Sequence, residues 1–169
     1  RTKRSDLVVE AAAWFAQWGR RVVVHLVGSA NAELERELRD RARDSDIADI
    51  HVTGFVDEQT FRDYLCAVDA GVQLRISPLL GVSGPLSDLS AFGTPAVASE
   101  GLCRDVGAPG YITPVPEMAS PVQIAEALET CIDNPWPVDA REAARQAYLA
   151  AMSPAGYVQQ LLDVVRGNR

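Results

Sequence analysis

The chain has 169 residues, a length that favours one compact domain with its own hydrophobic core over two domains. Apolar residues make up 47% of the sequence and aromatic residues 7%, which is typical of an α/β domain rather than of a disulfide-stapled module. The formal net charge of −7 disfavours a nucleic-acid partner, because phosphate backbones are bound by clustered Lys and Arg side chains.

The cysteine pattern and the apolar runs bear on where the protein resides. Cys66, Cys103 and Cys131 are far apart and form no CxxC pair, so neither a disulfide framework nor a metal site is indicated. We expect buried thiols in a reducing compartment. No apolar run approaches the ~20 residues that span a bilayer, and the start RTKRSD is unlike a signal peptide. We therefore expect a cytoplasmic protein with at most peripheral membrane association, and, since the chain starts with Arg inside a helix signal, a piece of a longer protein.

Strand and helix signals alternate along the chain. Apolar spacing predicts a first helix over Ser5–Gly19, with Ser5 or Asp6 as N-cap and Leu7, Val8, Ala11, Ala12 and Phe15 on its apolar face. The β-branched run Arg20–Gly28 is continuous enough to predict a strand covered on both faces. Further strands are predicted over Asp49–Phe55, Ala70–Ile76, Thr94–Ser99 and Gly110–Val115.

The intervening segments predict helices and one turn. The helices are expected over Ala32–Ser45, Asp57–Asp69, Gly84–Gly93, Pro121–Asn134, Ala140–Met152 and Pro154–Arg166. Gly101–Gly107 is expected to be a short turn. This alternation predicts right-handed βαβ units, and so an α/β, Rossmann-like fold with a doubly wound parallel sheet in one domain over residues 1–169.

In such a sheet, ligands bind beyond the carboxyl ends of the strands. The loops at that edge are Gly28–Asn31, Gly54–Val56, Arg75–Gly84 and Glu100–Arg104. None has the G-x-G-x-x-G or G-x-x-x-x-G-K-[ST] pattern, which argues against a nicotinamide enzyme and a P-loop nucleotidase. His25 and His51 lie inside predicted strands, where a core or sheet-face role outweighs catalysis, so we assign them no chemistry.

The turn Ser83-Gly84-Pro85 stands at the start of a predicted helix. Small residues there let an anion approach the unpaired N–H groups and the positive end of the helix dipole, so the turn could hold a phosphate. A tight strand-to-helix connection needs the same residues for backbone reasons. Asp88, one turn into the helix, could face a ligand or simply favour the dipole. The residues alone leave both alternatives open.

Several segments, in order, resemble retaining GT-B glycosyltransferases of the family-4 type. SDLSAFGTPAVAS is similar to the signature EAMACGTPVVAS, KRSDLVVEAAAWF to KGxxxLIEAF, and VVVHLVGSAN to LxIVGxG. IHVTGFVDEQTFRDYLCAVDAGVQL is similar to VxFxGxVxxEELxxYYxxADVxVxPS. The resemblance covers almost the whole chain. It implies the C-terminal, donor-binding half of a two-domain enzyme whose N-terminal, acceptor-binding domain lies outside this chain.

The resemblance also implies a site for a nucleotide-diphosphate sugar, without a separate cofactor or a metal. The N–H groups of Ser83, Gly84 and Leu86 would hold the diphosphate, and Asp88 would bind the ribose hydroxyls in place of the second glutamate of E-x7-E. Lys3 and Arg75 would stabilise the phosphate as leaving group. The donor is further expected to contact Gly28, Ser29, Phe55 and Val56. Gly54, Phe55 and Val56 would flank the base through backbone contacts.

One departure bears on activity. The first glutamate of E-x7-E falls on Leu80, which cannot hydrogen-bond a sugar hydroxyl, and Arg4 replaces the glycine that follows the phosphate-binding lysine. A non-catalytic GT-B-like binding or scaffolding module is therefore the alternative to the enzyme. The apolar stripe Tyr157, Leu161, Leu162 and Val165 could cross back to the N-terminal domain or pack on this one.

Overall fold

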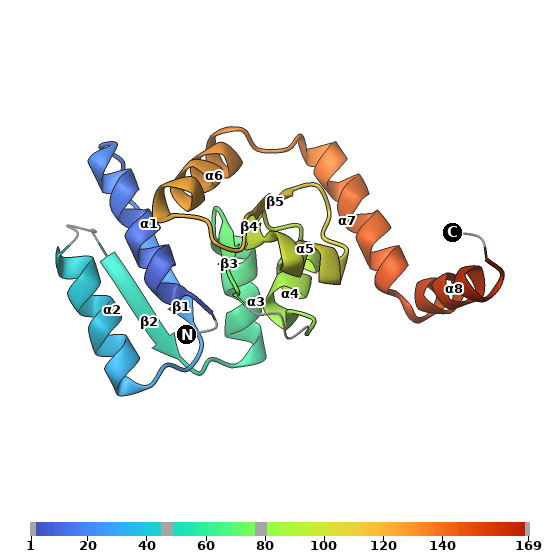
Figure 1. The fold of residues 1–169 in the computed structure, drawn as a ribbon, viewed down its shortest axis with the longest axis horizontal. Coiled ribbons are helices and arrows are strands. Elements are labelled where there is room, and N and C mark those ends of the chain that lie inside the picture. The colour runs from blue at the N-terminus through green and yellow to red at the C-terminus, as the bar shows by residue number, and fades with distance from the viewer. Residues whose placement is uncertain (1–2, 45–48, 77–80, 168–169) are drawn as a thin grey trace.

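The computed structural model describes residues 3–44, 49–76 and 81–167. Within them it has eight helices and five strands, which alternate for most of the chain (Figure 1). The helices are α1 (Ser5–Gln17), α2 (Ala32–Asp44), α3 (Glu58–Ala67), α4 (Gly84–Phe92), α5 (Glu100–Val106), α6 (Pro121–Asp133), α7 (Val138–Met152) and α8 (Pro154–Val165). The strands are β1 (Val23–Val27), β2 (Asp49–Gly54), β3 (Gly71–Gln73), β4 (Ala96–Ser99) and β5 (Ile112–Val115).

All the strand pairs are parallel, as predicted, but the strands form two sheets. β1 pairs with β2, starting with Val23 opposite Asp49. β4 lies between β3 and β5 and pairs with both. Within the described residues no ladder joins β1 to β3, so the doubly wound sheet is divided between them. The α/β class is confirmed, and the parallel strands are connected through helices as βαβ units require.

The central strand β4 separates two hydrophobic clusters. All four of its residues are buried, and their side chains alternate between the faces of the sheet. Val97 packs with residues of α1 and α6, whereas Ala96 and Ala98 pack with residues of α4 and α5. Helices therefore cover both faces of the β3–β4–β5 sheet, as a Rossmann-like fold requires.

Strand β1 is less covered than predicted. Val24 and Leu26 pack with α1 and α2 in a third cluster, but Val23 is 48% exposed and His25 is also exposed. The expectation that both faces are covered is therefore wrong. The helix that could cover the second face, α3, buries Leu65 against the α4–α5 cluster, so it leaves most of the second face of β1–β2 open.

The start of α1 also differs from the prediction. Its N-cap is Arg4, not Ser5 or Asp6, and Arg4 has φ 45° and ψ 38° with no side-chain cap. The buried face includes Val9, while Val8 is only partly buried, because the helix packs both on α6 and on α2. The apolar stripe was thus nearly correct, and the error came from a second packing partner that the sequence does not reveal.

Gly101–Gly107, predicted as a turn, is mostly helix α5. The carboxylate of Glu117 accepts a hydrogen bond from the Gly101 N–H at 2.8 Å, in the first turn of the helix. Gly107, with φ 60°, ends the helix in the left-handed region. The prediction took Gly101 and Gly107 as turn residues. Gly101 instead lies in the first turn of the helix, where its N–H is bonded to Glu117, and Gly107 ends the helix.

The cysteines differ in exposure. Cys131 is buried and Cys103 partly buried, as expected, but Cys66 is exposed on α3, so the expectation of three buried thiols is wrong for it. Burial raises the pKa of the Cys103 thiol to about 11, helped by the nearby carboxylates of Glu100 and Glu117. This thiol is therefore protonated near neutral pH and is a poor nucleophile.

The last two helices extend away from the sheets, with α8 at the far end of the molecule from α2 (Figure 1). Arg145 of α7 donates a hydrogen bond from Nη1 to the carbonyl of Ala91 at 3.1 Å, near the C-terminal end of α4. Tyr148 of the same helix is buried. In α8 no residue is buried, and Tyr157, Leu161, Leu162 and Val165 are all exposed.

Helix α4 packs closely on strand β3 at Gly71. A Cβ at Gly71 would lie 2.6 Å from Leu89 Cδ2. We expect Gly71→Ala to lower the free energy of unfolding by about 1–3 kcal/mol through overpacking. Urea denaturation measures the change, with Gly84→Ala as control, because a Cβ at Gly84 meets nothing within 4 Å. An unchanged midpoint for Gly71→Ala would contradict this packing.

Candidate functional site

The candidate site is built around the N-terminus of α4. Ser83, which is 1% exposed, is the N-cap, and its Oγ accepts a hydrogen bond from the Leu86 N–H at 3.4 Å. Gly84 and Pro85 are the first two helical residues, so Pro85 is at the second position rather than the first. Proline has no N–H, and the Leu86 N–H is already bonded, which leaves the Gly84 N–H as the helical donor for an anion.

Gly84 gives this helix start an open approach. The residue is exposed, and the position of a Cβ there has no atom within 4 Å. A ligand can therefore come close to the backbone. The helix dipole adds the equivalent of about half a positive charge at this end, which favours an anion.

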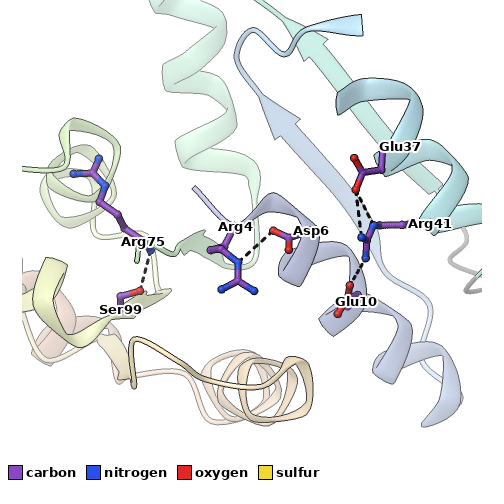
Figure 2. Close-up of polar contacts among 7 residues, drawn as sticks. All are labelled: Arg4, Asp6, Glu10, Glu37, Arg41, Arg75 and Ser99. Carbon is purple, nitrogen blue, oxygen red and sulfur yellow. Dashed lines mark hydrogen bonds and ion pairs between the residues drawn. The ribbon is translucent and has the colours of Figure 1, made fainter. Parts of the chain in front are cut away.

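Arg75 stands beside this helix start, after the end of β3. Its backbone N–H donates to the Ser99 Oγ at 3.0 Å, and its side-chain Nη1 donates to the Gly81 carbonyl at 3.1 Å (Figure 2 shows the bond to Ser99). Ser99 is 1% exposed and ends β4. These bonds connect the ends of two strands with the segment before α4, and they place a cation at the same sheet edge.

Asp88 lies four residues after Gly84, on the same side of α4. Its side chain is partly buried, and burial raises the pKa of this carboxyl. No hydrogen bond or ion pair to it is found among the residues that the structure describes. Among the described residues Asp88 is therefore an acceptor without a partner, one helical turn from the Gly84 N–H.

Lys3 and Arg4 precede α1. Lys3 is exposed and has no partner in the described ranges. Arg4 occupies the left-handed region, where glycine is favoured, and its Nε lies 3.5 Å from Asp6 Oδ1 (Figure 2). The position at which the resemblance expects glycine thus has the backbone conformation that glycine adopts most easily.

The loops after β1 and β2 are connected to each other. Gly28, with φ 124°, forms an antiparallel bridge with Gly54, and its N–H donates to Thr53 Oγ1 at 3.3 Å. Ser29 is exposed, and Val56 is partly buried. Phe55 is 87% exposed, so its ring is available for stacking.

The structure thus brings the predicted residues into two groups and a terminal pair. Ser83, Gly84, Leu86, Asp88 and Arg75 belong to the edge formed by β3, β4 and α4. Gly28, Ser29, Phe55 and Val56 belong to the β1–β2 edge. Leu80, in place of the motif's first glutamate, lies outside the described residues.

Two residues that hold Arg75 were not identified as site residues from the sequence. They are Ser99, a buried hydroxyl at the end of the apolar strand AVAS, and Gly81, which contributes a carbonyl. The signal for Ser99 was available, because a polar residue that ends a buried parallel strand points to the functional edge. For Gly81 no sequence signal existed, because a backbone carbonyl can belong to any residue.

A surface cavity among the described residues lies elsewhere. It has a volume of about 410 Å³, is open to solvent, and lies along α5 beside β5, lined by Glu100, Cys103, Arg104, Gly107, Ala108 and Pro114. None of the predicted donor-binding residues lines it. Among the described residues, no group of three or more His, Cys, Asp or Glu side chains could hold a metal ion, and none of the helices could cross a membrane.

Comparison with known proteins identifies the fold. No family model matches the chain, and no curated protein is significantly similar to it. Among solved structures it is similar to HepE of Anabaena, in complex with UDP and glucose, with a TM-score of 0.72, 17% identity, and coverage of 98% of this chain and 45% of HepE. It is also similar to Staphylococcus aureus TarM, a mutant in complex with fondaparinux, alpha-GlcNAc-glycerol and UDP (TM-score 0.65, 14% identity, 96% and 33% covered).

A third similar structure is the pneumococcal O-GlcNAc transferase GtfA, in complex with UDP and GlcNAc (TM-score 0.60, 15% identity, 98% and 33% covered). The chain therefore spans less than half the length of these three proteins. At these identities the likeness concerns the fold. The chain has the α/β, Rossmann-like fold of one half of a GT-B glycosyltransferase.

The Ser83 cap provides a test of the geometry at α4. Ser83→Ala removes the acceptor for the Leu86 N–H, and we expect it to lower the free energy of unfolding by about 0.5–2 kcal/mol. Thermal and urea denaturation measure the change. Ser87→Ala, inside the same helix, should be neutral or slightly stabilising because alanine has the higher helix propensity. Equal effects of the two substitutions would contradict the cap.

Proposed function

We propose that this chain is the donor-binding half of a retaining glycosyltransferase of the family-4 type, which transfers a sugar from a nucleotide-diphosphate donor. The carrying observation is the open helix start at Gly84 with Arg75 beside it, whose backbone N–H is bonded to Ser99 Oγ and whose guanidinium is bonded to the Gly81 carbonyl. The similarity to glycosyltransferases solved with UDP supports the proposal. The longer protein would add the acceptor-binding domain.

In this proposal the diphosphate lies at the start of α4. The Gly84 N–H and the helix dipole stabilise its charge, and the Ser83 N–H adds a backbone donor just before the helix. The Leu86 N–H, which the resemblance also assigned to the diphosphate, is bonded to Ser83 Oγ and serves the helix cap instead. Arg75 adds a full positive charge. As the bond to the sugar breaks, charge accumulates on the leaving diphosphate, and these groups stabilise it in the transition state.

The nucleoside lies between α4 and the β1–β2 loops in the same proposal. Asp88 accepts hydrogen bonds from the ribose hydroxyls, and the exposed Phe55 ring stacks on the base beside Val56. Gly28 and Ser29 border the donor from the loop after β1. Lys3, an exposed cation without a partner in the described chain, reaches the phosphates from the start of α1.

The alternative is a non-catalytic module that kept the fold and lost the chemistry. Leu80, in place of the first glutamate of E-x7-E, favours it. Both proposals include nucleotide binding and a cytoplasmic location, with at most peripheral membrane association of the longer protein and no nucleic-acid partner. Sugar transfer by the longer protein distinguishes the two, because only the enzyme turns over donor.

Substitutions of Asp88 and of Arg75 should weaken the binding of different ligands if the donor binds as proposed. We expect Asp88→Ala to weaken the binding of uridine, UMP and UDP alike, by about 1–3 kcal/mol, because the Asp88 carboxylate contacts the ribose that all three share. Arg75→Ala should weaken UDP more than UMP or uridine, and this loss should shrink as salt rises. Calorimetric titrations of the chain at two salt concentrations measure both, followed by GDP and ADP to define the base.

One further site variant and two control variants make this test specific. Gly84→Ala fills the open approach without a clash, so it should weaken UDP while leaving the melting temperature unchanged. Asp63→Ala and Arg43→Ala remove exposed charges outside the proposed site and should leave binding unchanged. If a variant bound every ligand more weakly to the same extent, in step with a loss of stability, the proposed site would be contradicted while the fold assignment would stand. Sugar transfer by this chain alone would overturn the half-enzyme proposal.

The exposed apolar residues of α8 are explained in this proposal by a contact with the acceptor-binding domain. Because no residue of α8 is buried here, we expect its amides to exchange hydrogen quickly in this chain and slowly in the longer protein. Hydrogen exchange with mass spectrometry compares the two, with α6, whose Ile124 and Ala125 are buried, as internal reference. Equal protection of α8 in both proteins would contradict the contact.

A further inference from the structure

The only two histidines of the chain are neighbours across two strands. His25 of β1 lies opposite His51 of β2 in the parallel register, although 26 positions separate them in the sequence. Their ring centroids are 5.0 Å apart, and the ring planes differ by 18°. Nothing in the proposed donor site uses this pair.

The pair lies on the open face of the β1–β2 sheet. Val24, Leu26 and Ile50 pack with α1 and α2, so side-chain alternation directs His25 and His51 to the other face. Both histidines are exposed. The neighbouring ring is that of Tyr64 in α3, whose centroid is 5.3 Å from that of His25. Solvent and ions therefore reach both imidazoles.

From this pair we propose that His25 and His51 bind one divalent transition-metal ion, of the class of Zn²⁺, Ni²⁺ and Cu²⁺. Imidazole nitrogen is a preferred ligand of these ions. With metal–nitrogen bonds of about 2.0 Å, two imidazoles that share an ion have ring centroids about 4.5–5 Å apart, close to the separation observed. The rings stack in this structure, so each must rotate about its Cβ–Cγ bond to turn a nitrogen toward the common ion, a rotation that leaves the centroids nearly in place. Water fills the other positions, since the described residues offer no cluster of three ligands.

The fold gives such an ion a structural role. β1 and β2 pair only with each other among the described strands, and a two-stranded sheet is only marginally stable by itself. One ion bound by both strands would link them across the register. Binding to the folded pair alone stabilises it by mass action. The acidic chain, with a net charge of −7, also raises the local concentration of cations.

The test uses the untagged chain with Cys66→Ser throughout, because the exposed Cys66 thiol could also bind these ions. Ni²⁺ is titrated by calorimetry into this protein, into His25→Phe and His51→Phe, and into the double variant. Phenylalanine keeps an aromatic ring for stacking and removes the nitrogen ligands. Removing a group that only supports a metal ligand already costs about tenfold or more in metal affinity, and each single variant removes a ligand itself. We therefore expect each single variant to bind Ni²⁺ at least about tenfold more weakly.

Two further measurements distinguish a shared ion from unrelated surface binding. Electron paramagnetic resonance of the Cu²⁺ complex should show one more coordinating nitrogen in the reference protein than in either single variant. Saturating Ni²⁺ should raise the melting temperature of the reference protein and leave that of the double variant unchanged. Should a phenylalanine variant not fold, His51→Gln replaces it. The proposal is overturned if the reference protein and the double variant bind Ni²⁺ equally, or if the nitrogen count does not change.

Discussion

Burial of the short strand β4 is the constraint on which most of this structure depends. All four of its residues are buried, it pairs on both sides, and its side chains alternate between two hydrophobic clusters. Small residues are needed there because helices pack on both faces. The same closeness favours glycine at position 71, where Leu89 of α4 packs on β3. Packing at the centre of the domain therefore depends on the close approach of helices to strands as well as on the apolar surface that is buried.

The candidate site follows from how β4 ends. Ser99 is the last residue of the strand, and its buried hydroxyl is satisfied by the N–H of Arg75. This bond fixes the end of β3 beside the end of β4, and the Arg75 side chain in turn binds the Gly81 carbonyl. A rigid core thus positions a cation and a helix start at one edge, where an anionic ligand gains from both.

The β1–β2 unit differs in character from this centre. It is held by its own ladder and by α1 and α2 on one face, while its other face is open. Its loops are joined through Gly28, Thr53 and Gly54. In the proposed function this unit contributes the base-binding wall, while α1 joins it to the core by packing on both α2 and α6.

The sequence by itself determined the α/β class, most of the helix and strand positions and the sheet edge at which the candidate site was sought, because these depend on local periodicity and on turn residues. It also located Ser83 and Gly84 at a helix start. Only the tertiary structure decided that α5 is a helix, which Glu117 helps to hold, and that Arg4 begins α1. Likewise it decided the division of the sheet, the bond from Arg75 to Ser99 and the meeting of His25 with His51. These features join residues far apart in the chain, and local patterns carry no information about such pairs.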